Sequence, residues 1–292
     1  MAAWLQEYGG SIPDKTFLQL LFYFKMGYRL DLKSPQTFSE KLQWLKLYNR
    51  RPEYTQMVDK LAVKEYVAGR IGKEYVIPTL GVWDRPEDID WDALPNRFVL
   101  KTTHGGGSGG VIICKDKNAI DRHEVVDKLK CSLKQDIYRN FREWPYKNVS
   151  RRILAEEFIE PVTLTNDLPD YKIFCFNGEP KYCQVISGRG TKMCIDFFDK
   201  DWNHQPFHEP REYPFAEMTP KKPKNFDIMW REARKLAVGE AFVRIDFYDV
   251  DYKVLFGEVT FFPTSGMGGF SPREFDRLLG RMISLPGHPG KC

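Results

Sequence analysis

Three pairs of short β-branched and aromatic runs, each pair joined by a turn, constrain the fold of this 292-residue chain most strongly. The pairs occupy residues 97–115, 171–186 and 242–262. In the second pair, the runs YKIFCF and PKYCQVI flank Asn177-Gly178, which is the strongest short-range signal of a β-hairpin. A further run, MCIDFF (193–198), has the composition of a strand. The sequence therefore predicts antiparallel sheets built from hairpins.

Helical patterns precede and separate these runs. Residues 14–70 are predicted to be largely helical, and the stretch from Thr37 to Glu40 (TFSE) has the form of a capping box. Residues 121–141 and 227–242 are also predicted to be helical, whereas RILAEEFIE (152–160) is predicted to form a strand. Residues 78–96, which are rich in Pro and Asp, are interpreted as a connection. The pattern indicates an α+β fold with helices packed on antiparallel sheets.

The composition excludes several classes of protein. A hydrophobic fraction of 42% with 29% charged residues is ordinary for a globular chain, and the length fits two lobes. No apolar run approaches the roughly 20 residues that span a bilayer, and the first residues lack the order of a signal peptide, so we expect a cytoplasmic protein. The six cysteines lack zinc spacing, and a net charge of +4 is too small to indicate nucleic-acid binding.

The third hairpin is predicted to place two carboxylates opposite each other. Because side chains alternate along a strand, Arg244 and Asp246 share one face of FVRIDFY, and Glu258 and Thr260 share one face of VLFGEVTFF. A short turn sets Asp246 opposite Glu258, and such like charges are destabilising unless positive charge lies between them. Mg²⁺ would supply that charge, since it commonly binds one or two protein carboxylates. The alternative is that Arg244 neutralises both acids.

The glycine-rich stretch KTTHGGGSGG (101–110) is a candidate phosphate site. A P-loop places its lysine after the last glycine at a helix start, whereas Lys101 precedes these glycines and a strand follows them. Backbone N–H groups of a glycine-rich tip approach anionic oxygens without interference from Cβ atoms, and Lys101 adds a positive charge. The alternative is a hairpin turn without function. For His104 a phosphate contact and an exposed loop position are both open, and the second is favoured.

Taken in order along the chain, these motifs resemble the ATP-grasp superfamily. The matching elements are Asp59-Lys60 at a helix start, Lys101 before the glycines, EEFI (156–159), DYK (170–172), and Arg244-x-Asp246 followed by Glu258-x-Thr260. The segments LKSPQTFSEKLQWLKLYNR, RFVLKTTHGGG, DYKIFCFNGEPKY and FGEVTFFPTSG are similar to the TupA-like branch in particular, which is associated with teichuronopeptide and other surface-polysaccharide synthesis. The similarity covers roughly residues 15 to 285.

The resemblance implies an α+β ATP-grasp fold in which two lobes with antiparallel sheets grip ATP, preceded by a short helical segment. It divides the chain into a helical segment (1–57), an N-lobe with a glycine-rich flap (58–150), a C-lobe with a metal site (151–285) and a tail (286–292).

The resemblance also implies roles for single residues. The lysines and glycines are expected at the ATP phosphates, EEFI at the adenine and Asp170 at the ribose, which gives the set Lys60, Lys101, Gly105, Gly106, Gly107, Ser108, Glu156, Glu157, Phe158, Ile159, Asp170 and Lys172. The expected Mg²⁺ ligands are Asp246, Glu258 and Thr260, the last standing where the superfamily usually has Asn. Arg244 is expected to stabilise the charge of an acyl phosphate. Arg189, Lys192 and Lys172 are expected to contact phosphate or substrate, or else to be exposed cations.

The activity that the resemblance implies is carboxylate–amine ligation. ATP phosphorylates a carboxylate, and an amine then displaces phosphate to leave an amide. The expected substrates are an amino acid or other amine and a uronic acid or similar carboxylate of a capsule or wall polysaccharide, made in association with membrane-bound assembly machinery. The loop PTSGMGG (263–269) is expected to donate backbone N–H groups to the reacting carboxylate. Two alternatives remain open, which are a sugar kinase of the same fold and a nucleotide-binding scaffold without catalysis.

Overall fold

The computed structural model describes residues 1–105, 108–160, 170–188, 192–210, 212–250 and 253–287. The chain divides into two compact units. Unit 1 comprises Met1–Arg50, Arg139–Trp144 and Pro161–Cys292, and unit 2 comprises Arg51–Tyr138 and Pro145–Glu160. These limits differ from the domain limits expected from the sequence, and the latter stay a prediction.

Unit 2 contains a four-stranded antiparallel sheet in the order β1-β4-β2-β3, formed by β1 (Thr79–Trp83), β2 (Phe98–Thr102), β3 (Val111–Cys114) and β4 (Ile153–Glu157). The pairing of β2 with β3 confirms the hairpin predicted at 97–115. Strand β1 lies inside the stretch 78–96, so the interpretation of that whole stretch as a connection is wrong. The run TLGVW is short and borders Pro78, and the Pro and Asp residues after it dominated the pattern.

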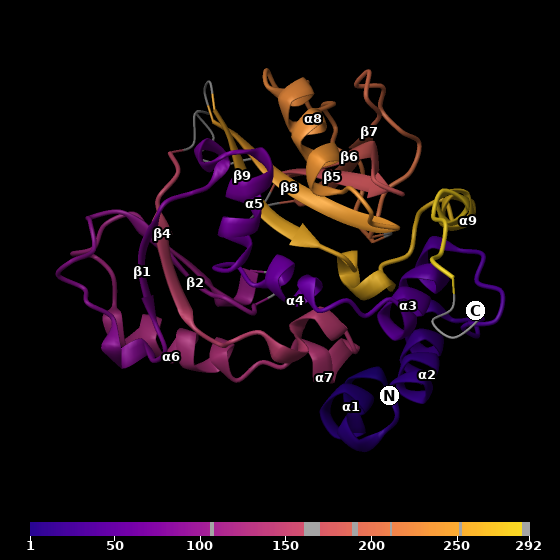
Figure 1. The fold of residues 1–292 in the computed structure, drawn as a ribbon, viewed down its shortest axis with the longest axis horizontal. Helices are drawn as coiled ribbons and strands as arrows, with labels where there is room; N and C mark the ends of the chain where they lie inside the picture. The colour runs from indigo at the N-terminus through magenta and orange to yellow at the C-terminus, as the bar shows by residue number, and fades with distance from the viewer. Residues whose placement is uncertain (106–107, 161–169, 189–191, 211, 251–252, 288–292) are drawn as a thin grey trace. The chain divides into compact units, whose positions relative to one another are not determined.

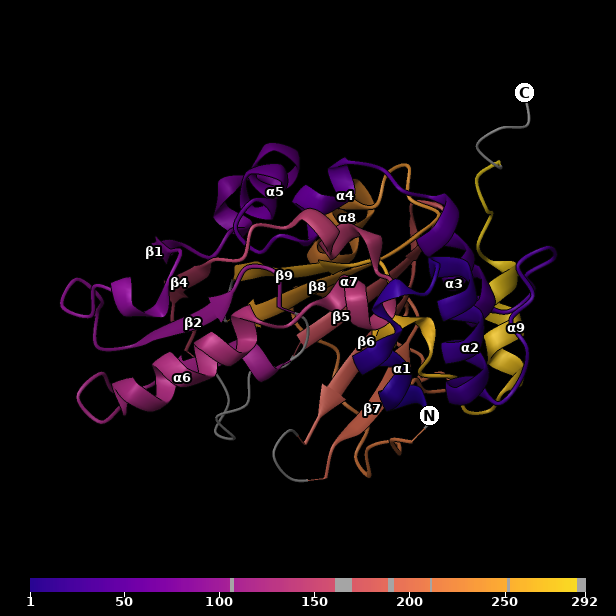
Figure 2. The same cartoon turned by 90° about the horizontal axis from the view of Figure 1, so that it is seen from below.

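Helix α6 (Arg122–Leu133) covers one face of this sheet, along β2 (Figure 2). Side chains at alternate positions of β2 and β4 form the core there with Val125 and Leu129 of the helix, among them Phe98, Leu100, Ile153 and Ala155. The positions between them, including Lys101 and Glu156, therefore belong to the opposite face of the strands. The other helices that begin in this unit are α4 (Glu53–Val58), α5 (Val63–Ile71) and α7 (Ile137–Phe141).

Unit 1 contains a five-stranded antiparallel sheet in the order β7-β6-β5-β8-β9. The strands are β5 (Asp170–Phe176), β6 (Glu179–Ser187), β7 (Cys194–Phe198), β8 (Phe242–Val250) and β9 (Lys253–Thr260). Asn177 and Gly178 both have positive φ, 49° and 81°, as a type I′ hairpin turn requires. Figure 1 shows helix α8 (Phe226–Leu236) lying against this sheet, where it contacts β5, β6 and β8. The hairpins predicted here are confirmed.

Four further helices of unit 1 are α1 (Ala2–Tyr8), α2 (Asp14–Met26), α3 (Phe38–Tyr48) and α9 (Glu274–Arg281). The capping box at the start of α3 is confirmed, because the Glu40 N–H donates to Thr37 Oγ1 (3.1 Å) and the Thr37 N–H donates to Glu40 Oε2 (3.0 Å). Phe38 anchors α3 by ring contacts with three further phenylalanines of the core, Phe176, Phe242 and Phe270. Within the described residues, no helix combines the length and the apolar character needed to cross a membrane.

Candidate functional site

Unit 2 buries one carboxylate between two lysines. Lys101 of β2 and Lys64 of α5 form ion pairs with the two oxygens of Glu156, at 2.5 Å to Oε2 and 2.7 Å to Oε1. The Glu156 side chain is 6% exposed and the lysines are 12–13% exposed. Burial alone would raise the pKa of Glu156, but the two lysines outweigh it and hold that pKa below the ordinary value. The set therefore carries one positive charge in excess, on the sheet face opposite α6.

Lys60 is attached to the start of the glycine loop. Asp59 Oδ1 accepts the N–H groups of Leu61 (2.8 Å) and Ala62 (3.2 Å), which fixes the turn before α5. The Lys60 N–H donates to the Thr103 carbonyl (3.0 Å), and its ammonium donates to the Gly105 carbonyl. Lys60 therefore contacts the residues that follow β2, the strand of Lys101, and the expected role of both lysines at phosphate stays a prediction.

The two ends of the glycine loop are held by close packing. Thr102 Oγ1 and Ser132 Oγ lie 2.8 Å apart in a buried hydroxyl pair. A Cβ atom on Gly105 would lie 2.6 Å from Thr102 Oγ1, and one on Gly110 would lie 2.9 Å from it. A larger residue at either position would therefore displace the buried hydroxyl pair. Ser108 begins a 3-10 turn (Ser108–Gly110), and Gly106 and Gly107 lie outside the described residues.

His104 is buried, with 3% of its surface exposed, so the interpretation as an exposed loop residue is wrong. Burial lowers its pKa, and the charge of Arg151 lowers it further. The sequence pattern missed this because a glycine run suggests an exposed loop, whereas Thr103 and His104, in the turn directly after β2, are both buried.

The expected adenine segment EEFI leaves the sheet at its end. Glu156 stands opposite both Thr79 and Val99, so its backbone lies inside the sheet, and β4 ends at Glu157. Phe158 and Ile159 follow without regular structure. The Arg97 guanidinium lies 4.6 Å from the centre of the Phe158 ring and forms an ion pair with Glu160. The adenine contacts of these residues stay a prediction.

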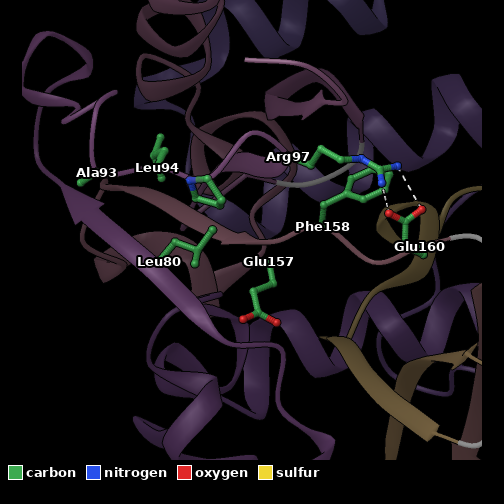
Figure 3. A pocket seen from close by; sticks show the side chains of 8 residues that line it. Leu80, Ala93, Leu94, Arg97, Glu157, Phe158 and Glu160 are labelled. Carbon is green, nitrogen blue, oxygen red and sulfur yellow. Dashed lines mark hydrogen bonds and ion pairs between the residues drawn. The ribbon is translucent and has the colours of Figure 1, made fainter. Parts of the chain in front are cut away.

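A cavity of about 450 Å³ lies beside this segment (Figure 3), lined by Leu80, Ala93, Leu94, Pro95, Arg97, Glu157, Phe158 and Glu160. Glu157 shares its face of β4 with Ile153 and Ala155, which belong to the core under α6. The lysine-paired Glu156 belongs to the other face. This cavity is therefore separated by the sheet from the charged set.

Unit 1 brings the predicted metal ligands together. Asp246 of β8 stands directly opposite Glu258 of β9, as predicted, and Arg244 stands opposite Thr260. Arg244 Nη2 lies 2.8 Å from Asp246 Oδ2, 2.8 Å from Glu258 Oε1 and 3.0 Å from Thr260 Oγ1. Oxygens of the three predicted ligands thus converge on a single cationic nitrogen. The structure also matches the alternative in which Arg244 neutralises both acids.

Lys172 completes this set from the neighbouring strand. It stands opposite Asp246 in the sheet, donates to Asp246 Oδ2 and lies 3.2 Å from an oxygen of Asp170. Burial raises the pKa of Asp246 although Arg244 and Lys172 oppose the change, and the charge of Glu258 adds to it. Burial would lower the pKa of Arg244, but Asp246 and Glu258 outweigh it and raise that pKa. Lys172 is therefore placed with the acids, rather than as an exposed cation.

The donor chemistry of this set suits Mg²⁺, because two carboxylates and a hydroxyl are hard oxygen ligands. Among the residues described, no group of three or more His, Cys, Asp or Glu side chains is placed to hold a metal ion. A Mg²⁺ site here would thus depend on two carboxylates, as this ion permits when substrate phosphates complete its coordination.

Lys192 and Arg189 are the two remaining candidate catalytic residues, and the structure describes only the first. Lys192 lies at the surface, where it forms a 3.2 Å ion pair with Glu217, and both side chains are more than 70% exposed. Arg189 lies outside the described residues. Their catalytic roles stay predictions.

The loop after β9 has an unusual backbone. Thr264, Ser265 and Gly266 have φ of 46°, 56° and 62°, a left-handed run that costs energy at the two non-glycine residues. The N–H groups of Ser265 and Met267 donate within the loop, to Phe262 and Thr264 carbonyls. These two N–H groups are thus occupied and cannot serve a carboxylate as expected from the sequence.

Four buried polar residues that the sequence pattern did not single out hold this loop. Gln43 Nε2 donates to the carbonyls of Ser265 (3.1 Å) and Gly266 (3.0 Å), and Lys46 Nζ donates to the Ser265 carbonyl (2.8 Å). The hydroxyls of Ser265 and Thr264 donate to Glu143 and Glu209. These residues come from distant segments, so no local pattern could have identified them.

Glu209 has a special place in this group. Its carboxyl is buried against the loop, and its own carbonyl accepts a 2.6 Å hydrogen bond from Gln184, which stands opposite Lys172 in the sheet. Burial raises the pKa of Glu209 to about 7, although the Thr264 hydroxyl and the charge of Arg244 oppose the rise. Glu209 thus lies at the same face of the sheet as Lys172 and Asp246.

The fold of this chain belongs to a known class. The chain matches the family model of the TupA-like ATP-grasp proteins over residues 40–284, and it belongs to that family. The membership confirms the predicted ATP-grasp fold class. A search of curated proteins found no match.

Several solved structures are similar to the chain. D-alanine–D-alanine ligase from Bacillus anthracis is 18% identical, over 72% of this chain and 58% of that one, with a TM-score of 0.42. The corresponding enzyme from Helicobacter pylori is 13% identical over 85% and 70%, with a TM-score of 0.44. The ATP-grasp ligase PsnB with minimal precursor, Mg and ADP is 14% identical over 76% and 57%, with a TM-score of 0.39. The chain thus spans 58% of the length of the first.

Proposed function

We propose that this chain is an ATP- and Mg²⁺-dependent ligase that joins a carboxylate to an amine. The observation that carries the proposal is the convergence of Asp246, Glu258 and Thr260 oxygens on one cationic nitrogen in a TupA-like ATP-grasp chain. A site built to surround positive charge with oxygens on paired strands suits a divalent ion. The domain limits and the cytoplasmic location expected from the sequence are part of the same proposal.

The phosphate contacts are assigned to unit 2. Lys101 and Lys60 supply positive charge beside the glycine loop, and Lys64 joins them because it shares Glu156 with Lys101. The excess positive charge of this set favours an anionic ligand. Gly105 to Ser108 are assigned to the phosphates, EEFI to the adenine and Asp170 to the ribose.

The metal contacts are assigned to unit 1, with Asp246, Glu258 and Thr260 as ligands. Mg²⁺, when bound, neutralises phosphate charge during phosphoryl transfer. Arg244 and Lys172 form ion pairs with the two carboxylates, and Arg244 is assigned the role of stabilising the negative charge of an acyl phosphate. Lys192 and Arg189 are proposed to contact the substrates.

The proposed reaction uses ATP to phosphorylate a carboxylate, which gives ADP and an acyl phosphate. The amine nitrogen then attacks the carbonyl carbon, the carbon–oxygen bond to phosphate breaks, and the amine loses a proton. The products are an amide, ADP and inorganic phosphate. A uronic acid or similar carboxylate of a surface polysaccharide and an amino acid or other amine are the proposed substrates.

The test measures ADP and inorganic phosphate in parallel, against a panel of uronic-acid glycans and amines. We expect ADP and phosphate in equal amounts, dependent on both substrates and on Mg²⁺, and we expect Glu258→Gln to lower the rate at least 100-fold. Glu179→Gln is the matched control, since Glu179 is an exposed acid of the same sheet that pairs with Arg234. ADP without phosphate would indicate a kinase. ATP binding without turnover would indicate a scaffold, and a normal rate in Glu258→Gln would refute the metal assignment.

A further inference from the structure

Exposed large hydrophobic side chains are concentrated at the amino end of the chain. Eleven are exposed among the described residues, and six of them lie within residues 1–24, namely Met1, Trp4, Tyr8, Leu20, Tyr23 and Phe24. The other five are spread over residues 113–278. Single exposed apolar residues are ordinary on protein surfaces, but a cluster marks an interaction site. We call these six residues the amino-terminal face.

The cluster follows from helices that are apolar on two sides. In α1, Met1, Trp4 and Tyr8 are spaced by three and four residues and face outward, whereas Leu5 is buried. The Trp4 and Tyr8 rings lie 5.8 Å apart.

Helix α2 repeats this arrangement beside α1 (Figure 1). Its buried side, including Phe17, Leu18, Leu21 and Phe22, packs into unit 1, while Leu20, Tyr23 and Phe24 are exposed at i, i+3 and i+4. Neither α1 nor α2 needs the outward side chains for the core. These exposed apolar side chains are therefore available to contact a binding partner.

The charges around the amino-terminal face favour an anionic partner. Residues 1–33 expose four cations, Lys15, Lys25, Arg29 and Lys33, against two acids, Glu7 and Asp31. A third acid, Asp14, is held in ion pairs with Arg50 (2.7 Å) and Arg142 (3.0 Å), so its charge is compensated within the unit. Lys25 follows Phe24 in α2, and its ammonium lies 5.8 Å from the centre of the Phe141 ring, so it adds positive charge to the helix that carries the exposed apolar side chains.

We propose that the amino-terminal face docks on the surface of a membrane that contains anionic lipid. Trp and Tyr have an apolar body and a polar tip, which suits the boundary between headgroups and acyl chains. Exposed Lys and Arg beside such an apolar face bind anionic headgroups, and helices of this kind lie in the plane of the interface. Helices α1 and α2 have seven and thirteen residues, so the contact is peripheral. The proposal does not depend on the ligase activity.

The test is co-sedimentation of the full chain with vesicles of phosphatidylcholine alone or mixed with phosphatidylglycerol. We expect binding to the mixed vesicles, weakened by high salt because the charge contribution is screened. The triple variant Trp4→Ser/Tyr23→Ser/Phe24→Ser is expected to lower the bound-to-free ratio at least tenfold. The matched control is Ile113→Ser/Met218→Ser/Val238→Ser, which removes as many exposed apolar side chains elsewhere and is expected to bind like the wild type.

Further measurements separate the sources of binding. Lys15→Gln/Lys25→Gln/Arg29→Gln is expected to remove the difference between the two kinds of vesicle. Circular dichroism and thermal unfolding should be unchanged in all variants, since every substituted residue is exposed. A wild type that stays in the supernatant with both vesicles, or equal binding by the two apolar variants, would overturn the proposal. A wild-type dimer that the amino-terminal variant abolishes would assign this face to a second copy of the chain instead.

Discussion

Each of the two units contains a set of ion-paired side chains on its sheet, and the charge that predominates differs between the two sets. In unit 2, a buried carboxylate, Glu156, lies between Lys64 and Lys101, so positive charge is in excess. In unit 1, the carboxylates Asp170, Asp246 and Glu258 share Lys172 and Arg244, so the acids outnumber the cations among these five side chains. Both sets include neighbouring strands of an antiparallel sheet, where facing positions bring charges close. The predominant charge of each set is opposite to that of the proposed ligand, which is phosphate for unit 2 and Mg²⁺ for unit 1.

The pKa shifts show how differently the two sets are balanced. Burial opposes the ionised form in both, but the lysines overcome it at Glu156, whose pKa is lowered, and the cations do not overcome it at Asp246, whose pKa is raised. Glu156 is thus fully compensated as a carboxylate. Asp246 would gain from further positive charge, which is what a divalent ion supplies.

Replacement of the central acid of unit 2 has the largest expected effect on stability. Glu156→Gln leaves Lys64 and Lys101, which are 12–13% exposed, without their shared carboxylate, and loss of one partner from a buried ion pair costs about 3–5 kcal/mol of unfolding free energy. Urea unfolding followed by circular dichroism measures the loss.

Asp246→Asn is the counterpart in unit 1. It removes a carboxylate whose ionised form burial already disfavours, and Glu258 remains to pair with Arg244, so a smaller loss of unfolding free energy is expected. Equal losses in the two variants would contradict the difference in balance described here.

Glu209 is a third buried acid, and its carboxylate accepts a hydrogen bond from the Thr264 hydroxyl. We predict that it makes the stability of the protein depend on pH. Its folded pKa of about 7 exceeds the ordinary 4.5, so the folded state keeps a proton that the unfolded chain has lost between these values. Stability attributable to this group is therefore present below pH 4.5 and falls as the pH rises to 7.

Glu209→Gln removes this loss while keeping an oxygen to accept from Thr264. We expect the variant to exceed the wild type by up to about 3 kcal/mol of unfolding free energy at pH 8, and the difference to vanish below pH 4.5. Urea unfolding at a series of pH values checks this. A variant less stable than the wild type at pH 8 would show that the ionised carboxylate is well solvated or paired.

Local patterns account for most of the fold. Alternation and the Asn177-Gly178 turn identified the hairpins, and TFSE identified the start of α3, because turns and caps depend on residues close in sequence. Strand β1 was not predicted, because its five residues beside Pro78 are too few to show a clear alternation of apolar and polar side chains. Its partner, β4, is about 70 residues away, and pairing over that distance leaves no local trace.

The site was predictable where geometry follows from alternation. The opposition of Asp246 and Glu258 needed only the strand period and a turn, and it is observed. The pairing of Lys64 with Glu156 joins a helix to a strand, and the contacts of Glu209 and Lys46 with the loop after β9 join segments far apart in sequence. Such contacts are set by packing, which periodicity does not encode. The only local sign of Lys64 was its position four residues after Lys60 in the sequence.

Removal of one lysine from each set is expected to change the free energy of nucleotide binding by less than the stability changes predicted above. Lys101→Met should weaken binding of Mg²⁺-free ATP about 10- to 100-fold, because a charge-assisted hydrogen bond contributes roughly 1.5–3 kcal/mol. Lys172→Met should weaken it less, since Asp170 and Asp246 hold that lysine. Isothermal titration calorimetry measures both constants, and an equal effect of the two variants would contradict the assignment of phosphate to unit 2.

The smallest expected effect on stability concerns Lys192, which lies outside both sets. Its ion pair with Glu217 joins two side chains that are 71% and 87% exposed. Such surface pairs contribute little because water and salt screen the charges, so Lys192→Ala should change the unfolding free energy by less than about 0.5 kcal/mol. Any change in turnover can then be attributed to the reaction itself. A raised KM with unchanged stability would place Lys192 at the substrate, as proposed, whereas unchanged kinetics in both Lys192→Ala and Glu217→Gln would show that the pair is only a surface contact.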